Sequence, residues 1–219
     1  MMRQLDYGAR PPASGRVGQI VVFLHGYGAD GADLLGLADP MAPHLPDTLF
    51  LAPDAPQPCV ANPFGRQWFP IPWIDGSSEV EAAEGLARAA TDLDAFLDAR
   101  LAETGLSPDR LALVGFSQGA MVALQVAPRR PAAVAGVVAI SGRLLDPARL
   151  AAEALVRPPV LLIHGDRDEV VPFADLDLAG RALAGAGFEV YAHVMRGTGH
   201  GIAPDGLGAA LAFLRDRLG

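Results

Sequence analysis

The sequence predicts an α/β fold in which a mostly parallel sheet is covered by helices on both faces. Short aliphatic runs recur along the 219 residues, and each ends in glycine or a turn-forming residue, as strands buried on both faces do. Amphipathic stretches separate these runs, and this alternation favours parallel pairing. Because 51% of the residues are hydrophobic, the chain can bury one continuous core, and residues 1–219 are expected to form a single domain.

The aliphatic runs and the stretches between them give the expected elements in chain order. At least six strands are expected, at 19–26, 47–54, 110–117, 132–141, 158–165 and 188–197. The clearest helical stretch is 77–105, in which Ser78 and Glu81 have the spacing of a capping box and Gly105 supplies a C-terminal stop. Further helices are expected at 30–41, 118–127, 175–186 and 205–217.

Two segments fall outside this alternation. Residues 1–19 form an N-terminal extension that adds little to the pattern. Residues 53–78 contain six prolines and both tryptophans of the chain. A loop this long is either functional or hides an element that the pattern does not reveal, and we expect it near the active site.

Charge and cysteine usage exclude several classes of protein. The net charge of -8 is spread along the chain, which argues for solubility and against a nucleic-acid partner. The lone Cys59 cannot form an internal disulfide, and the first residues lack the apolar run of an exported leader, so a cytoplasmic location is expected. No segment approaches the roughly 18 apolar residues of a spanning helix, so stable membrane insertion is not expected.

One serine stands where a predicted strand meets a predicted helix. The pattern Gly115-x-Ser117-x-Gly119 places the hydroxyl at a sharp turn, and the flanking glycines leave clearance for the neighbouring strand and helix. The pentapeptide alone is weak, since small residues also serve merely to pack a helix onto a strand. Its position between strand and helix favours a nucleophile.

A serine hydroxyl needs a base, and the base needs an acid to orient it. Asp166, Asp168 and Glu169 follow one buried strand, and His200 lies between glycines after the last strand. The resulting chain order of Ser, Asp and His is that of the α/β hydrolases. Position at the strand end does not by itself separate Asp168 from Asp166, which could instead cap the turn.

Four stretches carry a specific resemblance: FLHGYGADGADL (23–34), GFSQGAMVAL (115–124), IHGDRDEVVP (163–172) and GTGHGI (197–202). Together they resemble the carboxylesterase and lysophospholipase group of the α/β hydrolases, which includes the acyl-protein thioesterases. The resemblance extends from about Ile20 to the last helix. It implies an α/β-hydrolase fold and an enzyme that needs no cofactor.

The resemblance also implies a role for each matching residue. Ser117 is the nucleophile, Asp168 is the acid, and His200 is the general base. The backbone N–H groups of Tyr27 and of Gln118 form the oxyanion hole.

The remaining histidines have structural interpretations. His25 and His164 each precede a glycine at a strand end and could hydrogen-bond neighbouring loops, His193 lies within a strand, and His44 lies in a proline-flanked loop. No His-x-x-x-His or Cys-x-x-Cys spacing is present, so no metal site is expected.

The aromatic part of the 53–78 loop has two interpretations. Trp68, Phe69, Ile71 and Trp73 could form a satellite core, or they could line one wall of an acyl pocket. Ligands of α/β proteins bind beyond the carboxyl ends of the parallel strands, so the pocket is favoured.

These observations predict a serine hydrolase that cleaves carboxylic esters with short- to medium-chain acyl groups, its partner being a small-molecule or lipid-like ester. Thioester hydrolysis and lysophospholipid cleavage are alternatives, because all three use the same acyl-enzyme chemistry. A binding protein that kept the fold without activity is an alternative of another class. A homodimer is compatible with the apolar composition and with the resemblance.

Overall fold

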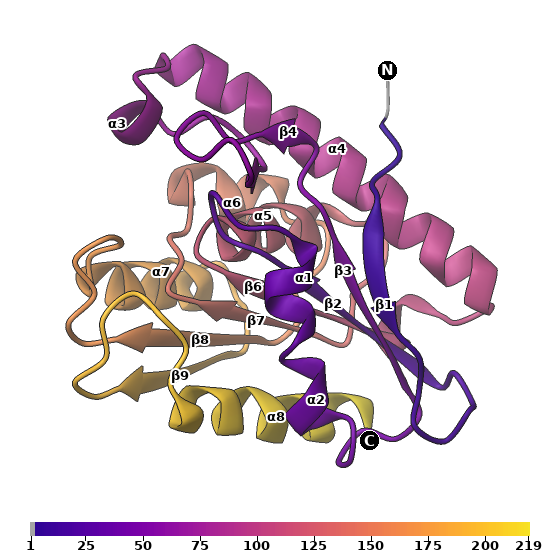
Figure 1. The fold of residues 1–219 in the computed structure, drawn as a ribbon. Helices are drawn as coiled ribbons and strands as arrows, with labels where there is room; N and C mark the ends of the chain where they lie inside the picture. The colour runs from indigo at the N-terminus through magenta and orange to yellow at the C-terminus, as the bar shows by residue number, and fades with distance from the viewer. Residues whose placement is uncertain (1–2) are drawn as a thin grey trace.

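The computed structural model describes residues 3–219 and is built around a seven-stranded sheet with the order β1-β3-β2-β6-β7-β8-β9 (Figure 1). β1 is antiparallel to β3, and every other neighbouring pair is parallel. The strands of this sheet are β1 (Tyr7–Arg10), β2 (Gln19–Leu24), β3 (Thr48–Pro53), β6 (Leu111–Phe116), β7 (Gly136–Ile140), β8 (Val160–Gly165) and β9 (Val190–Met195). All six expected strands are present, and the predicted fold class is confirmed.

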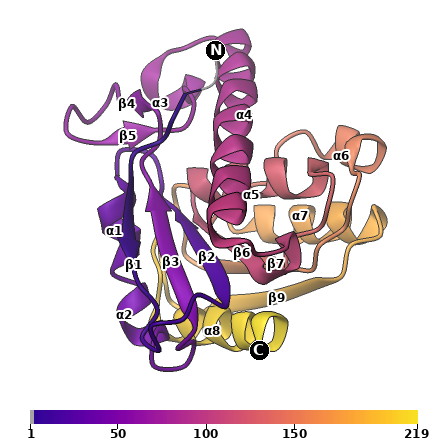
Figure 2. The ribbon, with the colours of Figure 1, turned by 90° about the vertical axis from the view of Figure 1, so that its right-hand side faces the viewer.

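Helices cover both faces of the sheet (Figures 1 and 2). The helices are α1 (Gly31–Leu35), α2 (Ala38–Met41), α3 (Pro72–Asp75), α4 (Glu79–Thr104), α5 (Gln118–Val126), α6 (Pro147–Glu153), α7 (Ala174–Gly185) and α8 (Pro204–Leu218). In β2, Val22 faces the apolar cluster that includes residues of α4, α5 and α7. Phe23 faces the opposite cluster, which includes residues of α1, α2 and α8. Alternation of side chains along fully buried strands therefore supplies both halves of the core.

The longest helix has the ends that the sequence predicts. The Ser78 side chain accepts a hydrogen bond from the Glu81 N–H, and the Glu81 side chain accepts one from the Ser78 N–H, so the capping box is complete. Gly105 ends α4 in the left-handed conformation, with φ of 69°.

Three details differ from the expectation. Tyr7–Arg10, within the expected N-terminal extension, form β1, the antiparallel edge of the sheet beside β3. The helix expected at 30–41 is divided between α1 and α2; Pro40 lacks the N–H that a continuous helix would need there. α6 was not predicted.

Residues 53–78 contain short regular elements. β4 (Gln57–Pro58) and β5 (Arg66–Gln67) pair antiparallel, and α3 follows them. Figure 2 shows this segment beside one end of α4. Within residues 3–219, no helix combines the length and the apolar character needed to cross a bilayer.

Candidate active site

Ser117 lies between the last residue of β6 and the first residue of α5, in a strained backbone conformation. Its φ of 53° and ψ of -117° lie in a region of backbone conformation that residues other than glycine rarely adopt. The Ser117 N–H donates to the Ile140 carbonyl at 2.8 Å, which ties the turn to the end of β7. The turn therefore holds the hydroxyl beyond the carboxyl ends of the strands.

Gly119 makes this turn sterically feasible. A Cβ at Gly119 would lie 1.9 Å from the carbonyl oxygen of Leu24 and 2.7 Å from that of His25. The first turn of α5 thus packs directly against the backbone at the end of β2. The same contact brings the loop after β2 next to the serine.

His200 and Asp168 complete a chain of hydrogen bonds with this serine. The His200 Nε2 lies 3.0 Å from the Ser117 Oγ, and the His200 Nδ1 lies 2.8 Å from the Asp168 Oδ2. Both distances are those of ordinary hydrogen bonds. The structure therefore brings together the three residues that the sequence singled out, from loops after three different strands.

Asp168 is fixed from both sides of its carboxylate. The N–H groups of Val170 and Val171 each donate to Oδ1 at 2.9 Å, and the side chain has no exposed surface. Burial works against ionisation, but the hydrogen bonds from His200, Val171 and Val170 outweigh it, so the pKa of Asp168 lies below its ordinary value of 3.8. The carboxylate is thus ionised and oriented toward the imidazole.

His164 and Asp166 support the loops that carry the acid and the base. The buried His164 places Nε2 2.9 Å from the Val171 carbonyl and 3.3 Å from the Asp168 Oδ2. The Asp166 Oδ1 accepts from the Gly197 N–H at 2.6 Å, which joins its loop to the one that leads to His200. Asp166 lies in contact with that loop, and it is Asp168 that meets the imidazole.

Two backbone donors beside the serine are unused. Within residues 3–219, neither the N–H of Tyr27 nor that of Gln118 donates to another residue. Gln118 is the first residue of α5, where an N–H has no intrahelical partner. Such free donors suit an oxygen that gains negative charge during a reaction.

The aromatic loop is arranged differently from the expected pocket wall. Trp68, Phe69 and Ile71 are at most 5% exposed and belong to the large apolar cluster under α4 and α5. Trp73 is instead 62% exposed, and the guanidinium of Arg143 lies 5.6 Å from its ring centre. The first three side chains pack in the core, as the satellite-core interpretation expects, and whether any of the four lines an acyl pocket stays a prediction.

The other histidines have protein partners or lie at the surface. His25 is buried and bonded to the backbone, His193 lies 2.8 Å from the Asp205 carboxylate, and His44 is exposed. Within residues 3–219, no group of three or more His, Cys, Asp and Glu side chains is arranged to hold a metal ion.

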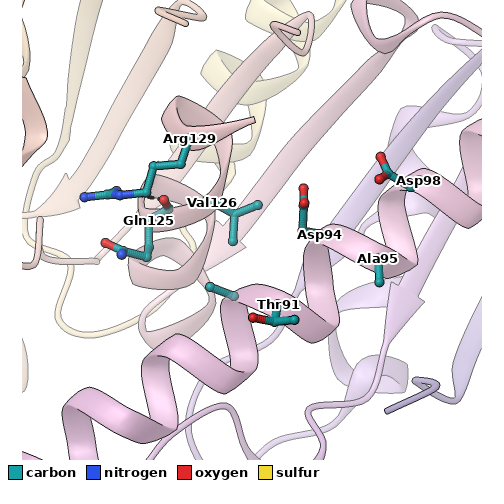
Figure 3. A pocket seen from close by; sticks show the side chains of 8 residues that line it. Thr91, Asp94, Ala95, Asp98, Gln125, Val126 and Arg129 are labelled. Atoms are coloured by element: carbon teal, nitrogen blue, oxygen red, sulfur yellow. Dashed lines mark hydrogen bonds between the residues drawn. The ribbon is translucent and has the colours of Figure 1, made fainter. Parts of the chain in front are cut away.

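A cavity of about 460 Å³ lies away from the triad, between α4 and the end of α5 (Figure 3). The side chains that line it are Ala90, Thr91, Asp94, Ala95, Asp98, Gln125, Val126 and Arg129. Asp94 and Asp98 form ion pairs with the buried Arg130. At a rise of 1.5 Å per residue, Gln125 lies roughly 12 Å along α5 from Ser117.

Comparison with known proteins identifies a family and several relatives. Residues 12–218 match the model of a family described as phospholipase/carboxylesterase. The chain is 28% identical to Esterase YpfH of Escherichia coli, over 90% of this chain and 82% of that protein. It is 30% identical to acyl-protein thioesterase 1 of Neurospora crassa, over 94% of this chain and 90% of that protein. The crystal structure of esterase PE8 is similar with a TM-score of 0.94 at 44% identity, covering 99% of this chain and 100% of that one.

Proposed function

Since the chain belongs to the phospholipase/carboxylesterase family, we propose that it hydrolyses carboxylic esters of short- and medium-chain acids through an acyl-enzyme on Ser117. The observation that carries the assignment of the nucleophile is the 3.0 Å contact between the Ser117 Oγ and the His200 Nε2 at a strained strand-to-helix turn. A hydroxyl so placed can lose its proton to the imidazole as it attacks.

The reaction uses the triad twice. The Ser117 oxygen attacks the ester carbonyl while the His200 Nε2 takes its proton, and the imidazolium then protonates the departing alcohol. Water attacks the acyl-enzyme by the same route and releases the acid. Throughout, the ionised Asp168 accepts a hydrogen bond from the His200 Nδ1–H and stabilises the positive charge on the ring.

The tetrahedral intermediates carry negative charge on the former carbonyl oxygen. The backbone N–H groups of Tyr27 and Gln118 are the donors proposed to receive it. Preorganised donors of this kind each contribute about 10²–10³ in kcat.

Replacement of Ser117 by Ala tests the assignment. Loss of the nucleophile is expected to lower kcat for a p-nitrophenyl ester by about a millionfold. Ser141→Ala is the matched control, because Ser141 also follows a strand, is buried and has a positive φ of 50°. Near-normal hydrolysis by Ser117→Ala would contradict the proposal.

Thioester hydrolysis is the second candidate, and the observation that favours it is the similarity to an acyl-protein thioesterase over most of both chains. The chemistry is unchanged, because only the leaving group differs. A panel of matched oxyesters, thioesters and lysophospholipids with the same acyl chain separates these substrates by their kcat/KM values.

We also propose a cytoplasmic location and a homodimer. The buried free thiol of Cys59 supports the first, since it fits a reducing compartment. Cell fractionation tests the location, and light scattering of the purified protein tests the dimer.

A further inference from the structure

Trp68 has no exposed surface, yet both of its N–H groups are used in hydrogen bonds that lead to the two oxyanion donors. The indole Nε1–H donates to the His25 carbonyl at 2.9 Å, and the backbone N–H donates to the Gln118 Oε1 at 2.8 Å. The residue thus links the loop after β2 to the first residue of α5.

The Gln118 side chain is held at both ends. Its Oε1 accepts from Trp68, and its Nε2 donates to the Phe69 carbonyl at 2.7 Å. With the side chain fixed in this way and fully buried, rotation of the residue would break two buried hydrogen bonds. The orientation of the Gln118 backbone N–H is therefore coupled to residues 68 and 69.

On the other side, Trp68 holds the loop that carries Tyr27. His25 precedes Tyr27 by two residues, and its ring is fixed because Nε2 accepts from the Ala55 N–H at 2.9 Å. An acceptor Nε2 leaves the proton on Nδ1, which lies 2.7 Å from the Gly26 carbonyl. Burial lowers the pKa of His25, in keeping with a neutral ring.

The same aromatic segment holds this loop at a second place. The Gly28 N–H donates to the Arg66 carbonyl at 2.8 Å, and the Arg66 N–H donates to the Ala29 carbonyl at 2.7 Å. The Asn62 amide donates to the Gly28 carbonyl at 2.8 Å. A Cβ on Gly65 would lie 2.0 Å from that carbonyl oxygen, so only glycine permits this approach.

We propose that Trp68 is a positioning residue that fixes the Tyr27 and Gln118 N–H donors in position relative to each other. In this way the 53–78 segment supports the oxyanion hole from behind, and this support is called the brace below. This inference rests on the proposed function. It assigns Trp68 a part in stabilising the transition state rather than in binding the acyl chain. Donors held rigidly before reaction lose no energy to reorganisation when charge develops.

Trp68→Phe is the first test, because it removes the indole N–H and keeps an aromatic ring. We expect kcat to fall by about tenfold to a hundredfold, as for other small displacements of reacting groups, with KM changed by less than about threefold. The loss should be the same for acetyl, butyryl and octanoyl esters. Phe64→Leu is the matched control, because Phe64 is 93% exposed in the same segment, and it should leave kcat unchanged.

The inhibition constant of a trifluoromethyl ketone distinguishes a positioning role from a purely structural one, because a purely structural role would leave it unchanged. Its adduct with the serine bears an oxyanion, so its inhibition constant should weaken in Trp68→Phe by the same factor as kcat/KM. Gln118→Met, which keeps the backbone N–H but loses both side-chain hydrogen bonds, should show the same pattern. The double variant should lose no more than the larger single loss, because both substitutions break one network.

Several results would overturn the inference: a kcat within twofold of the wild type in both single variants, a loss that depends on acyl-chain length, or unchanged affinity for the ketone. If Trp68→Phe does not fold, Gln118→Met and its ketone affinity decide the question. Failure of the proposed function is distinguishable, because the wild-type protein would then neither turn over esters nor react with the ketone.

Discussion

The turn at Gly115–Gly119 and the segment 53–78 both serve the same site, but their conformations have different origins. At the turn, the end of a buried strand, two glycines and the first residue of a helix lie within five residues, and this pattern can be read from adjacent positions in the sequence. In residues 53–78, the Trp68 indole and the backbone of Trp68 and Phe69 are hydrogen-bonded to partners 43 to 50 residues away along the chain. Local patterns therefore reveal a nucleophile, whereas a brace becomes visible only through tertiary contacts.

After the loss expected for Ser117→Ala, the next largest effect is expected at the acid of the triad, which also follows a strand end. Asp168→Asn should lower kcat by about 10⁴, because an amide does not stabilise the imidazolium or fix its tautomer. Asp166→Asn is the control, since its amide oxygen can still accept from the Gly197 N–H. Ester hydrolysis measured for the two variants checks this, and equal losses would contradict the assignment of Asp168 as the acid.

The turn itself can be broken sterically. Gly119→Ala places a methyl group 1.9 Å from the Leu24 carbonyl oxygen, and it should cost about 1–3 kcal/mol of stability and displace the serine. Gly208→Ala in α8 meets no neighbouring atom within 4 Å and should be neutral or stabilising. Urea unfolding of both variants measures the difference, and an unaffected Gly119→Ala would show that the turn tolerates a side chain.

The loop after β2, which Trp68 holds through the His25 carbonyl, should make stability sensitive to acid. Because burial lowers the pKa of His25 from 6.5, the unfolded chain holds a proton on this residue that the folded chain lacks between the folded pKa and 6.5. The free energy of unfolding should therefore decrease as pH falls through that window. His25→Gln keeps an acceptor for the Ala55 N–H but does not titrate, so its pH dependence should be shallower there. The free energy of unfolding is measured by urea titration at several pH values. The same pH dependence in the wild type and in His25→Gln would contradict the expectation that titration of His25 lowers stability in this window.

The smallest effect is expected at the tip of the same segment. Phe64→Ser changes a side chain that is 93% exposed, so stability should change by less than about 0.5 kcal/mol. A large destabilisation, measured by thermal unfolding, would mean that the tip is packed and that the brace extends further than its hydrogen bonds indicate.

The sequence predicted most of the fold because buried parallel strands carry a strong local signal. All six aliphatic runs became strands, and the caps of α4 lie at Ser78 and Gly105 as expected. β1 was not predicted, because this edge strand, YGAR, is short and only partly buried. α6 was missed because its seven residues carry little periodicity.

The residues of the site also differ in whether the sequence could predict their roles. Ser117, Asp168 and His200 could be found because each follows a strand end in a recognisable pattern, and the structure brings them within hydrogen-bonding distance. The part played by Trp68 could not be found, because an indole that donates to His25 and an indole that lines a pocket look alike in a sequence. Only tertiary contacts distinguish them: the indole Nε1–H donates to the His25 carbonyl, and the Trp68 backbone N–H donates to the Gln118 Oε1.

The most direct test of the account is covalent labelling with a fluorophosphonate, followed by intact-mass and peptide analysis. We expect one equivalent of label on the peptide that contains Ser117, and much slower labelling of His200→Ala, because the imidazole activates the hydroxyl. A protein that takes up no label, or that is labelled at another residue, would contradict the central claim that Ser117 is an activated nucleophile.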